Sequence, residues 1–268
     1  MADTNRLVKN FAALRASGKR TMVPFLTAGY PDLATTAALL AEIEQRGVKI
    51  CEIGFPFSDS IADGPTIQSS YYHALDGGVT CEGTFEMVAA YRSSGGKMAL
   101  VAMVSDSIVY RRGYEGFAAA AAAAGFDALL IPDLPLEEAQ KVAPVAAAHG
   151  LCCIMLVAPT STAARREQIA RSSSGFVYYM SVAGITGART ALPPETLSAV
   201  AELKTKTDTP ICVGFGISTP EMVAEVCKVA DGAIVGSAIV GRIAQAAANK
   251  ETLVKDVGDF VAELLAGA

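Results

Sequence analysis

The chain has 268 residues, of which 51% are hydrophobic, and a formal net charge of −5 with a sequence pI of about 5.2. A chain of this length with a mean hydropathy of +0.36 can bury a large core, which excludes an intrinsically disordered protein. No basic cluster indicates a nucleic-acid partner, and no apolar run approaches the ~18 to 20 residues that a membrane-spanning helix needs.

The N-terminal segment predicts an amphipathic helix. Residues 1–20 are mixed and charged, unlike a signal peptide. On a helix, Leu7, Phe11 and Leu14 would share one apolar face.

Cysteine usage indicates a reducing compartment. The chain has six cysteines and no C-x-x-C pair, and four of the six lie in apolar, strand-like runs. Buried free thiols are typical of cytosolic proteins, so we expect a cytoplasmic location.

From residue 21 onward, short apolar runs alternate with helical patterns. Eight runs predict strands, at residues 21–28, 49–55, 98–104, 128–132, 151–158, 175–181, 210–215 and 232–236. Helical patterns occupy residues 33–46, 66–76, 83–93, 114–124, 137–149, 163–171, 194–205, 219–228 and roughly 251–266. Asp32 can cap the first of these helices, and a hydroxyl at 218–219 precedes Pro220 at the start of another. Gly125 and Gly150 follow helix ends.

Buried strands separated by helices predict a parallel sheet that is covered on both faces. Eight such units favour a closed barrel over an open doubly wound sheet, and no G-x-G-x-x-G follows the first strand. No linker divides the chain. We therefore expect residues 1–268 to form a single (β/α)8 TIM-barrel domain with an extra N-terminal helix. Active sites of such barrels lie at the carboxyl ends of the strands.

The second predicted strand, residues 49–55, carries an inward-facing carboxylate. Alternation of side chains places Glu52 on the opposite face from the apolar Cys51, Ile53 and Phe55. Burial inside a barrel removes hydration and raises the pKa of a carboxyl group. A buried glutamate could instead be paired with a cation, but the other predicted strands contain no arginine and few lysines. A proton-transfer role is therefore favoured.

The loop after this strand contains Asp59 and Asp63, among the turn-forming residues Pro56, Gly64 and Pro65. On spacing alone, either aspartate can be a turn former or a helix cap as well as a functional acid.

The segment CEIGFPFSDSIADGPTIQ resembles the signature of tryptophan synthase alpha subunits. This resemblance implies that Glu52 is the catalytic glutamate, that Asp63 is the catalytic aspartate, and that Tyr178 is the tyrosine facing the glutamate. Ser60 stands where the family usually has proline. Because proline fixes φ, serine at this position is expected to loosen the loop.

A long loop follows the sixth predicted strand. Residues 182–192 contain two glycines, small residues and hydroxyls before a Pro-Pro pair. Such loops in barrels are usually functional, and this one predicts a mobile lid with Gly184 and Gly187 as hinges. Its match to the family's SxAGxTG motif implies that Thr186 meets Asp63.

The seventh and eighth strands end in the glycine-containing turns VGFGIST and AIVGSAIV. Barrels often bind phosphate at these strand ends, where backbone N–H groups and the N-terminus of a short helix attract the anion. The family resemblance matches Gly187, Gly216, Gly236 and Ser237 to phosphate-binding positions, so no lysine is required.

One segment departs from the family pattern. After the third strand the family usually shows Y-x-N, whereas this chain has Ser105, Asp106 and Ser107. These side chains are smaller or acidic, so the indole pocket should be packed differently at this point.

The resemblance implies retro-aldol cleavage of indole-3-glycerol phosphate to indole and glyceraldehyde 3-phosphate, in the last stage of tryptophan biosynthesis. Glu52 would carry both protons, and Asp63, ionised in a wetter loop, would accept a hydrogen bond from the indole N–H. The resemblance also implies no cofactor in this chain and pyridoxal phosphate in a beta-subunit partner. The two subunits would form an alpha2-beta2 heterotetramer through the loop after the second strand. No residue spacing indicates a metal site.

Three alternatives stand beside this interpretation. One is a stand-alone lyase that releases free indole without a partner. The second is a non-enzymatic subunit that activates a partner enzyme, and the third is a different phosphosugar barrel, such as an isomerase. The two retained acids argue against the second alternative, and the long signature argues against the third.

Overall fold

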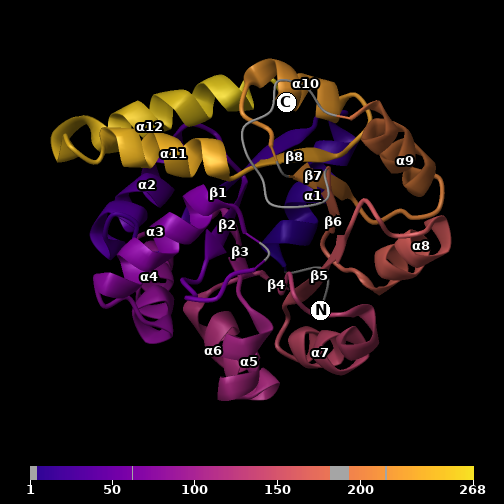
Figure 1. The fold of residues 1–268 in the computed structure, drawn as a ribbon, viewed down its shortest axis with the longest axis horizontal. Coiled ribbons are helices and arrows are strands. Elements are labelled where there is room, and N and C mark those ends of the chain that lie inside the picture. The colour runs from indigo at the N-terminus through magenta and orange to yellow at the C-terminus, as the bar shows by residue number, and fades with distance from the viewer. Residues whose placement is uncertain (1–4, 62, 182–192, 215) are drawn as a thin grey trace.

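The computed structural model describes residues 5–61, 63–181, 193–214 and 216–268. Eight parallel strands in these residues pair in chain order, and the last pairs with the first to close a barrel (Figure 1). The strands are β1 (Thr21–Thr27), β2 (Ile50–Gly54), β3 (Ala99–Met103), β4 (Ala128–Leu130), β5 (Cys152–Val157), β6 (Val177–Met180), β7 (Ile211–Gly214) and β8 (Gly232–Val235).

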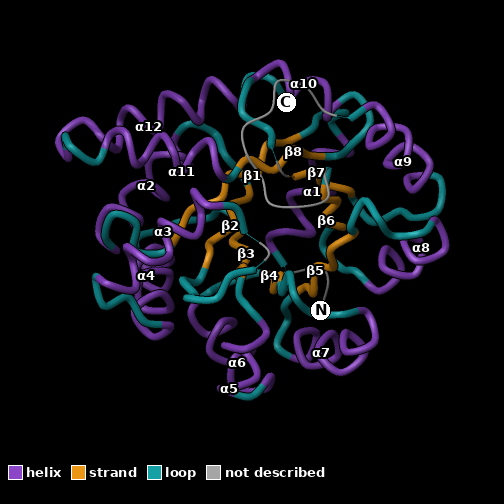
Figure 2. Tube along the Cα trace, viewed as in Figure 1, coloured by secondary structure: helices purple, strands orange, loops and turns teal. Residues whose placement is uncertain are grey.

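Helices surround the barrel on its outside, except for the first, which lies across one end of the barrel, as the tube in Figure 2 shows. They are α1 (Arg6–Ala16), α2 (Leu33–Gln45), α3 (Pro65–Asp76), α4 (Cys81–Ser93), α5 (Asp106–Arg112), α6 (Tyr114–Ala124), α7 (Leu136–Ala148), α8 (Ala163–Ser172), α9 (Pro194–Lys204), α10 (Pro220–Cys227), α11 (Ser237–Ala246) and α12 (Lys250–Leu265). The predicted barrel with an extra N-terminal helix is thus confirmed. None of the described helices is long and apolar enough to cross a membrane.

Alternating side chains sort the core into two layers. Cys51 and Ile53 of β2 join the apolar layer between strands and helices, whereas Ile50 lies in the cluster inside the barrel. Glu52, on the same face as Ile50, therefore points inward, as its position in the strand predicts.

Helix α1 closes the end of the barrel where the strands begin. Leu7 and Phe11 belong to the inner cluster, and the Phe11 ring lies 5.8 Å from that of Phe176, centroid to centroid. Leu14 packs against the same cluster while partly buried. The candidate site lies at the opposite end of the barrel, which is formed by the carboxyl ends of the strands.

The predicted caps are present. Asp32 accepts a hydrogen bond from the Thr35 N–H at 2.7 Å, and Thr219 accepts one from the Met222 N–H at 3.3 Å. Gly125 follows α6 with φ +102°, a conformation that favours glycine.

Helix α5 was not predicted from the sequence. It spans only seven residues, and one of them, Val109, is buried, so it carries no clear helical periodicity. Its first backbone N–H, at Asp106, donates to the Asp133 carboxylate at 2.8 Å, a contact supplied by a residue far along the chain.

Candidate active site

Six of the predicted site residues line one cavity at the carboxyl ends of the strands. The cavity encloses about 460 Å³ of empty space, with the open space at its mouth included. The six predicted residues are Glu52, Asp63, Tyr178, Gly216, Gly236 and Ser237. The other lining residues, which were not predicted as site residues, are Phe25, Gly64, Ile67, Met103 and Ile234. Strands two, six, seven and eight thus bring the predicted acids, tyrosine and glycines together.

Two strand-ending glycines make room for the aromatic side chains of this cavity. A Cβ at Gly214 would overlap the ring and hydroxyl of Tyr178, and a Cβ at Gly54 would overlap the Phe25 ring and the Tyr71 hydroxyl. The absence of a side chain at these positions therefore lets the rings lie across the inside of the barrel. Phe25, which is level with Glu52 in the paired strands, could have been found from the inward face of β1.

Glu52 is buried in this cavity with only 1% of its surface exposed. Its Oε1 atom has no hydrogen-bond partner among the described residues. Burial, with a smaller effect of the negative charge of Asp63, raises the pKa of the Glu52 carboxyl to about 8. The carboxyl group is therefore mainly protonated at neutral pH, and it can donate a proton into the cavity.

Asp63 lies in the loop between β2 and α3, on the wall of the same cavity. The prediction of a wetter environment for this carboxylate is wrong, because the residue is only 7% exposed. Burial raises the pKa of the Asp63 carboxyl, the Ser60 hydroxyl lowers it, and the charge of Asp133 raises it. The loop folds inward because Gln68 of α3 donates from Nε2 to the carbonyls of Ser60 and Asp63, at 2.8 and 3.0 Å.

The glycines after β7 and β8 form an open cradle of backbone. Gly216 has φ +79°, and an added Cβ would meet nothing within 4 Å, so its backbone borders free space. Gly236 is the N-cap of α11, and Ser237 is the first residue of that helix. The first N–H groups of a helix have no partner within the helix and carry the positive end of its dipole. This cradle can hold an anion without a basic side chain.

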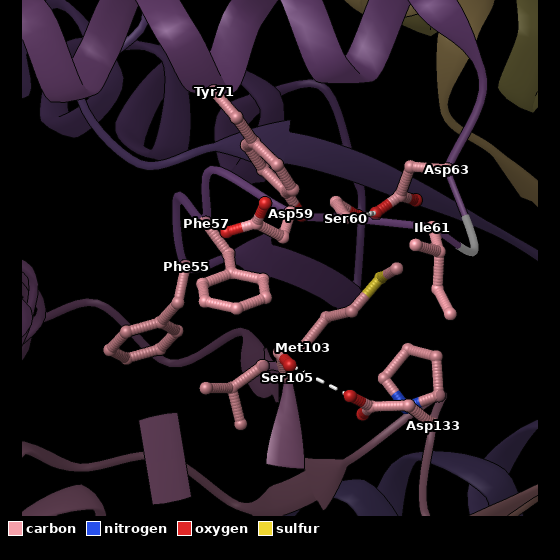
Figure 3. Close-up of a pocket in the computed structure, with 12 residues that line it drawn as sticks. Phe55, Phe57, Asp59, Ser60, Ile61, Asp63, Tyr71, Met103, Ser105 and Asp133 are labelled. Carbon is pink, nitrogen blue, oxygen red and sulfur yellow. Dashed lines mark hydrogen bonds between the residues drawn. The ribbon is translucent and has the colours of Figure 1, made fainter. Parts of the chain in front are cut away.

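A second cavity of about 360 Å³, open space included, adjoins the first (Figure 3). The two share the side chains of Asp63 and Met103. Ser105, in the segment that departs from the family pattern, donates from Oγ to Asp133 Oδ2 at 2.7 Å in this second cavity. The segment after strand three therefore forms a polar pair across two neighbouring strand ends, and no sequence pattern indicated Asp133 as the partner of Ser105.

Four further predicted residues are not part of the first cavity as the structure describes it. Gly184, Thr186 and Gly187 lie outside the described residues. Asp59 is exposed and accepts a hydrogen bond from the Ser58 hydroxyl at 2.6 Å, which agrees with a turn-forming role. Within the described ranges, no group of three or more His, Cys, Asp and Glu side chains could hold a metal ion.

Comparison with known proteins gives a consistent result over nearly the whole chain. The family model "Tryptophan synthase alpha chain" matches residues 11–268. The chain is 43% identical over 260 residues to the tryptophan synthase alpha chain of Rhodopirellula baltica, covering 93% of this chain and 94% of the relative. It is also 43% identical over 253 residues to that of Caulobacter vibrioides, covering 94% and 92%.

Solved structures agree in fold as well as in sequence. Tryptophan synthase subunit alpha from Legionella pneumophila superposes with a TM-score of 0.89 at 34% identity, covering 97% of each chain. A chain of Mycobacterium tuberculosis tryptophan synthase superposes with a TM-score of 0.87 at 36% identity, covering 98% of each. The chain described here therefore belongs to the tryptophan synthase alpha chain family.

Proposed function

We propose that this chain cleaves indole-3-glycerol phosphate into indole and glyceraldehyde 3-phosphate. One observation carries the proposal: Glu52, whose Oε1 atom has no hydrogen-bond partner among the described residues and whose pKa is raised to about 8, lies in a cavity that also contains a backbone cradle for an anion. The substrate has a group that matches each feature. Its indole ring has a carbon that can accept the proton of Glu52, and its phosphate group can bind in the cradle.

Glu52 is the proposed proton carrier. It donates its proton to C3 of the indole ring, and the resulting cation draws electrons from the bond between C3 and the glycerol chain. As that bond breaks, its electron pair returns to the ring, and the adjacent hydroxyl loses its proton to Glu52 to form the aldehyde. A carboxyl group with a pKa of about 8 suits both transfers near neutral pH.

Asp63 and Tyr178 are the proposed supports for this step. Asp63 in its ionised form accepts a hydrogen bond from the indole N–H and stabilises the positive charge that develops on the ring. Burial raises the pKa of the Tyr178 hydroxyl, so it stays protonated and can donate to Glu52 or to the substrate. Thr186 is proposed as a lid residue that meets Asp63 on closure.

The phosphate group is proposed to bind at Gly216, Gly236 and Ser237, with Gly187 from the lid. We expect inorganic phosphate and glycerol 3-phosphate to compete with the substrate. Gly216→Asp should weaken the binding of both competitors at least about tenfold, because it places a negative charge beside the bound anion. Inhibition constants measure this effect.

Gly150→Asp is the matched control for Gly216→Asp. Gly150 also has a positive φ, +75°, and open space around it, but it follows α7 on the outside of the barrel. Equal weakening in both variants would mean that backbone strain, not the cradle, causes the effect. Dephosphorylated indoleglycerol that binds as tightly as the natural substrate would also contradict the cradle.

The chain is proposed to work with a tryptophan synthase beta subunit, which would carry the pyridoxal phosphate in an alpha2-beta2 complex. The proposed contact is the loop from Pro56 to Pro65, which also carries Asp63. Docking that orders this loop would also place the aspartate, which couples binding to activity. The free cysteines support a cytoplasmic location for the complex.

Indole formation by the purified chain, with and without a beta subunit, tests both the reaction and the partnership. We expect low activity alone and a rise of at least about tenfold on adding the partner, because the loop that carries Asp63 is also the proposed contact with the beta subunit. Full activity in the isolated chain that no beta subunit changes would favour the stand-alone lyase. No indole under either condition would contradict the proposed reaction.

A further inference from the structure

Ser60, which replaces the family's usual proline, makes a contact that proline cannot make. Its hydroxyl donates a hydrogen bond to Oδ2 of Asp63, and Figure 3 shows the two side chains pointing toward one another. Gln68 fixes the backbone on both sides of this contact through the carbonyls of the same two residues. These three residues, called here the Ser60 clamp, join the loop after β2 to the first turns of α3.

We propose that Ser60 is a positioning residue whose hydroxyl holds the Asp63 carboxylate ionised and aimed into the cavity before substrate binds. The inference rests on the proposed function of Asp63. A carboxylate has two oxygens, so a donor on Oδ2 leaves Oδ1 with capacity for the indole N–H. The clamp thus serves the same reaction that the loop's aspartate is proposed to support.

The surroundings of Asp63 explain why such a donor matters. The titratable groups that face it are Glu52 of β2, Tyr71 of α3, Tyr178 of β6, Asp133 after β4 and Asp59 of its own loop. All five are acids or phenols, and no described residue lining either cavity is Lys, Arg or His. The Ser60 hydroxyl therefore favours the ionised form where burial and neighbouring charge oppose it.

The direct test is a titration of the Asp63 side-chain carboxyl by carbon NMR in the full chain, with the resonance assigned by Asp63→Asn. Ser60→Ala and Ser60→Pro remove the donor and should raise the midpoint by about one pH unit. Two or three hydrogen bonds from backbone N–H groups lower the pKa of a carboxyl group by about two pH units, and a single hydroxyl donor should have part of that effect. Ser60→Thr keeps a hydroxyl and should restore the wild-type midpoint.

Ser58→Ala is the matched control for this titration. Ser58 donates to the neighbouring carboxylate of Asp59 in the same loop, at 2.6 Å. Its loss should leave the Asp63 midpoint unchanged. An unchanged midpoint in Ser60→Ala, or a Ser60→Thr protein that titrates like Ser60→Ala, would overturn the inference.

Activity provides a second readout that separates this inference from the proposed function. In Ser60→Ala and Ser60→Pro, the acidic limb of the pH profile for indole formation should move up by the same ~1 unit, while the basic limb stays in place. On backbone freedom alone, proline should instead raise the unassisted activity. If the protein forms no indole but shows the NMR shift, the proposed reaction is wrong and the proposed role of Ser60 stands. If wild type is active but the acidic limb does not move in the Ser60 variants, only the proposed role of Ser60 is wrong.

Discussion

Glu52→Gln should abolish indole formation, with a loss of at least ~10²-fold in kcat, because glutamine can neither donate nor accept the proton that the reaction moves. Asp63→Asn should lower kcat by a similar factor, because a neutral amide no longer stabilises positive charge on the ring. Both side chains line the same cavity. Steady-state indole formation in the presence of a beta subunit measures both effects.

Glu86→Gln provides the control for these variants, since Glu86 is an exposed carboxylate on α4 and away from both cavities. Circular dichroism should show the same secondary structure in all three proteins. Turnover within about tenfold of wild type in Glu52→Gln would remove this residue as the proton carrier.

The stability of the chain should fall as the pH rises from about 5 to about 9, and Glu52→Gln should remove most of that fall. The folded-state pKa of about 8 lies above the ordinary value of 4.5, so the folded protein holds a proton that the unfolded chain has released. The contribution of Glu52 to the free energy of unfolding is complete below the pKa of the unfolded state and is lost as the pH rises through the pKa of the folded state. The difference of 3.5 pH units corresponds to at most about 5 kcal/mol of unfolding free energy.

Urea unfolding of wild type, Glu52→Gln and Glu86→Gln at both ends of this range measures the effect. Wild type and Glu86→Gln should lose stability in parallel, while Glu52→Gln stays nearly level. This outcome depends on burial alone and not on catalysis. Parallel curves for all three proteins would show that Glu52 is ionised or solvated in the folded state.

The strand pattern was enough to predict both the barrel and the position of Glu52. Each strand is short and buried on both faces, and an acid within such a run can avoid the apolar outer layer only by pointing inward. The positions of Gly216 and Gly236 followed from the same reasoning, because they lie two positions and one position past the ends of β7 and β8.

The sequence could not predict contacts that depend on how the loops fold over the barrel. Asp63 is buried because Gln68 draws the loop inward, and nothing in the spacing of the loop indicates that. Ser105 and Asp133 are 28 positions apart and meet because β3 and β4 are neighbours that end at the same side. On sequence grounds Ser60 was expected to loosen the loop, whereas in the structure its hydroxyl donates to the Asp63 carboxylate.

The pH dependence of kcat/KM for indole formation tests whether a protonated Glu52 drives the cleavage. We expect a bell-shaped profile, with an acidic limb from Asp63 and a basic limb that falls near the Glu52 pKa of about 8. A kcat/KM that stays constant from about pH 7 to about pH 9.5 would show that the proton donor is not this carboxyl group.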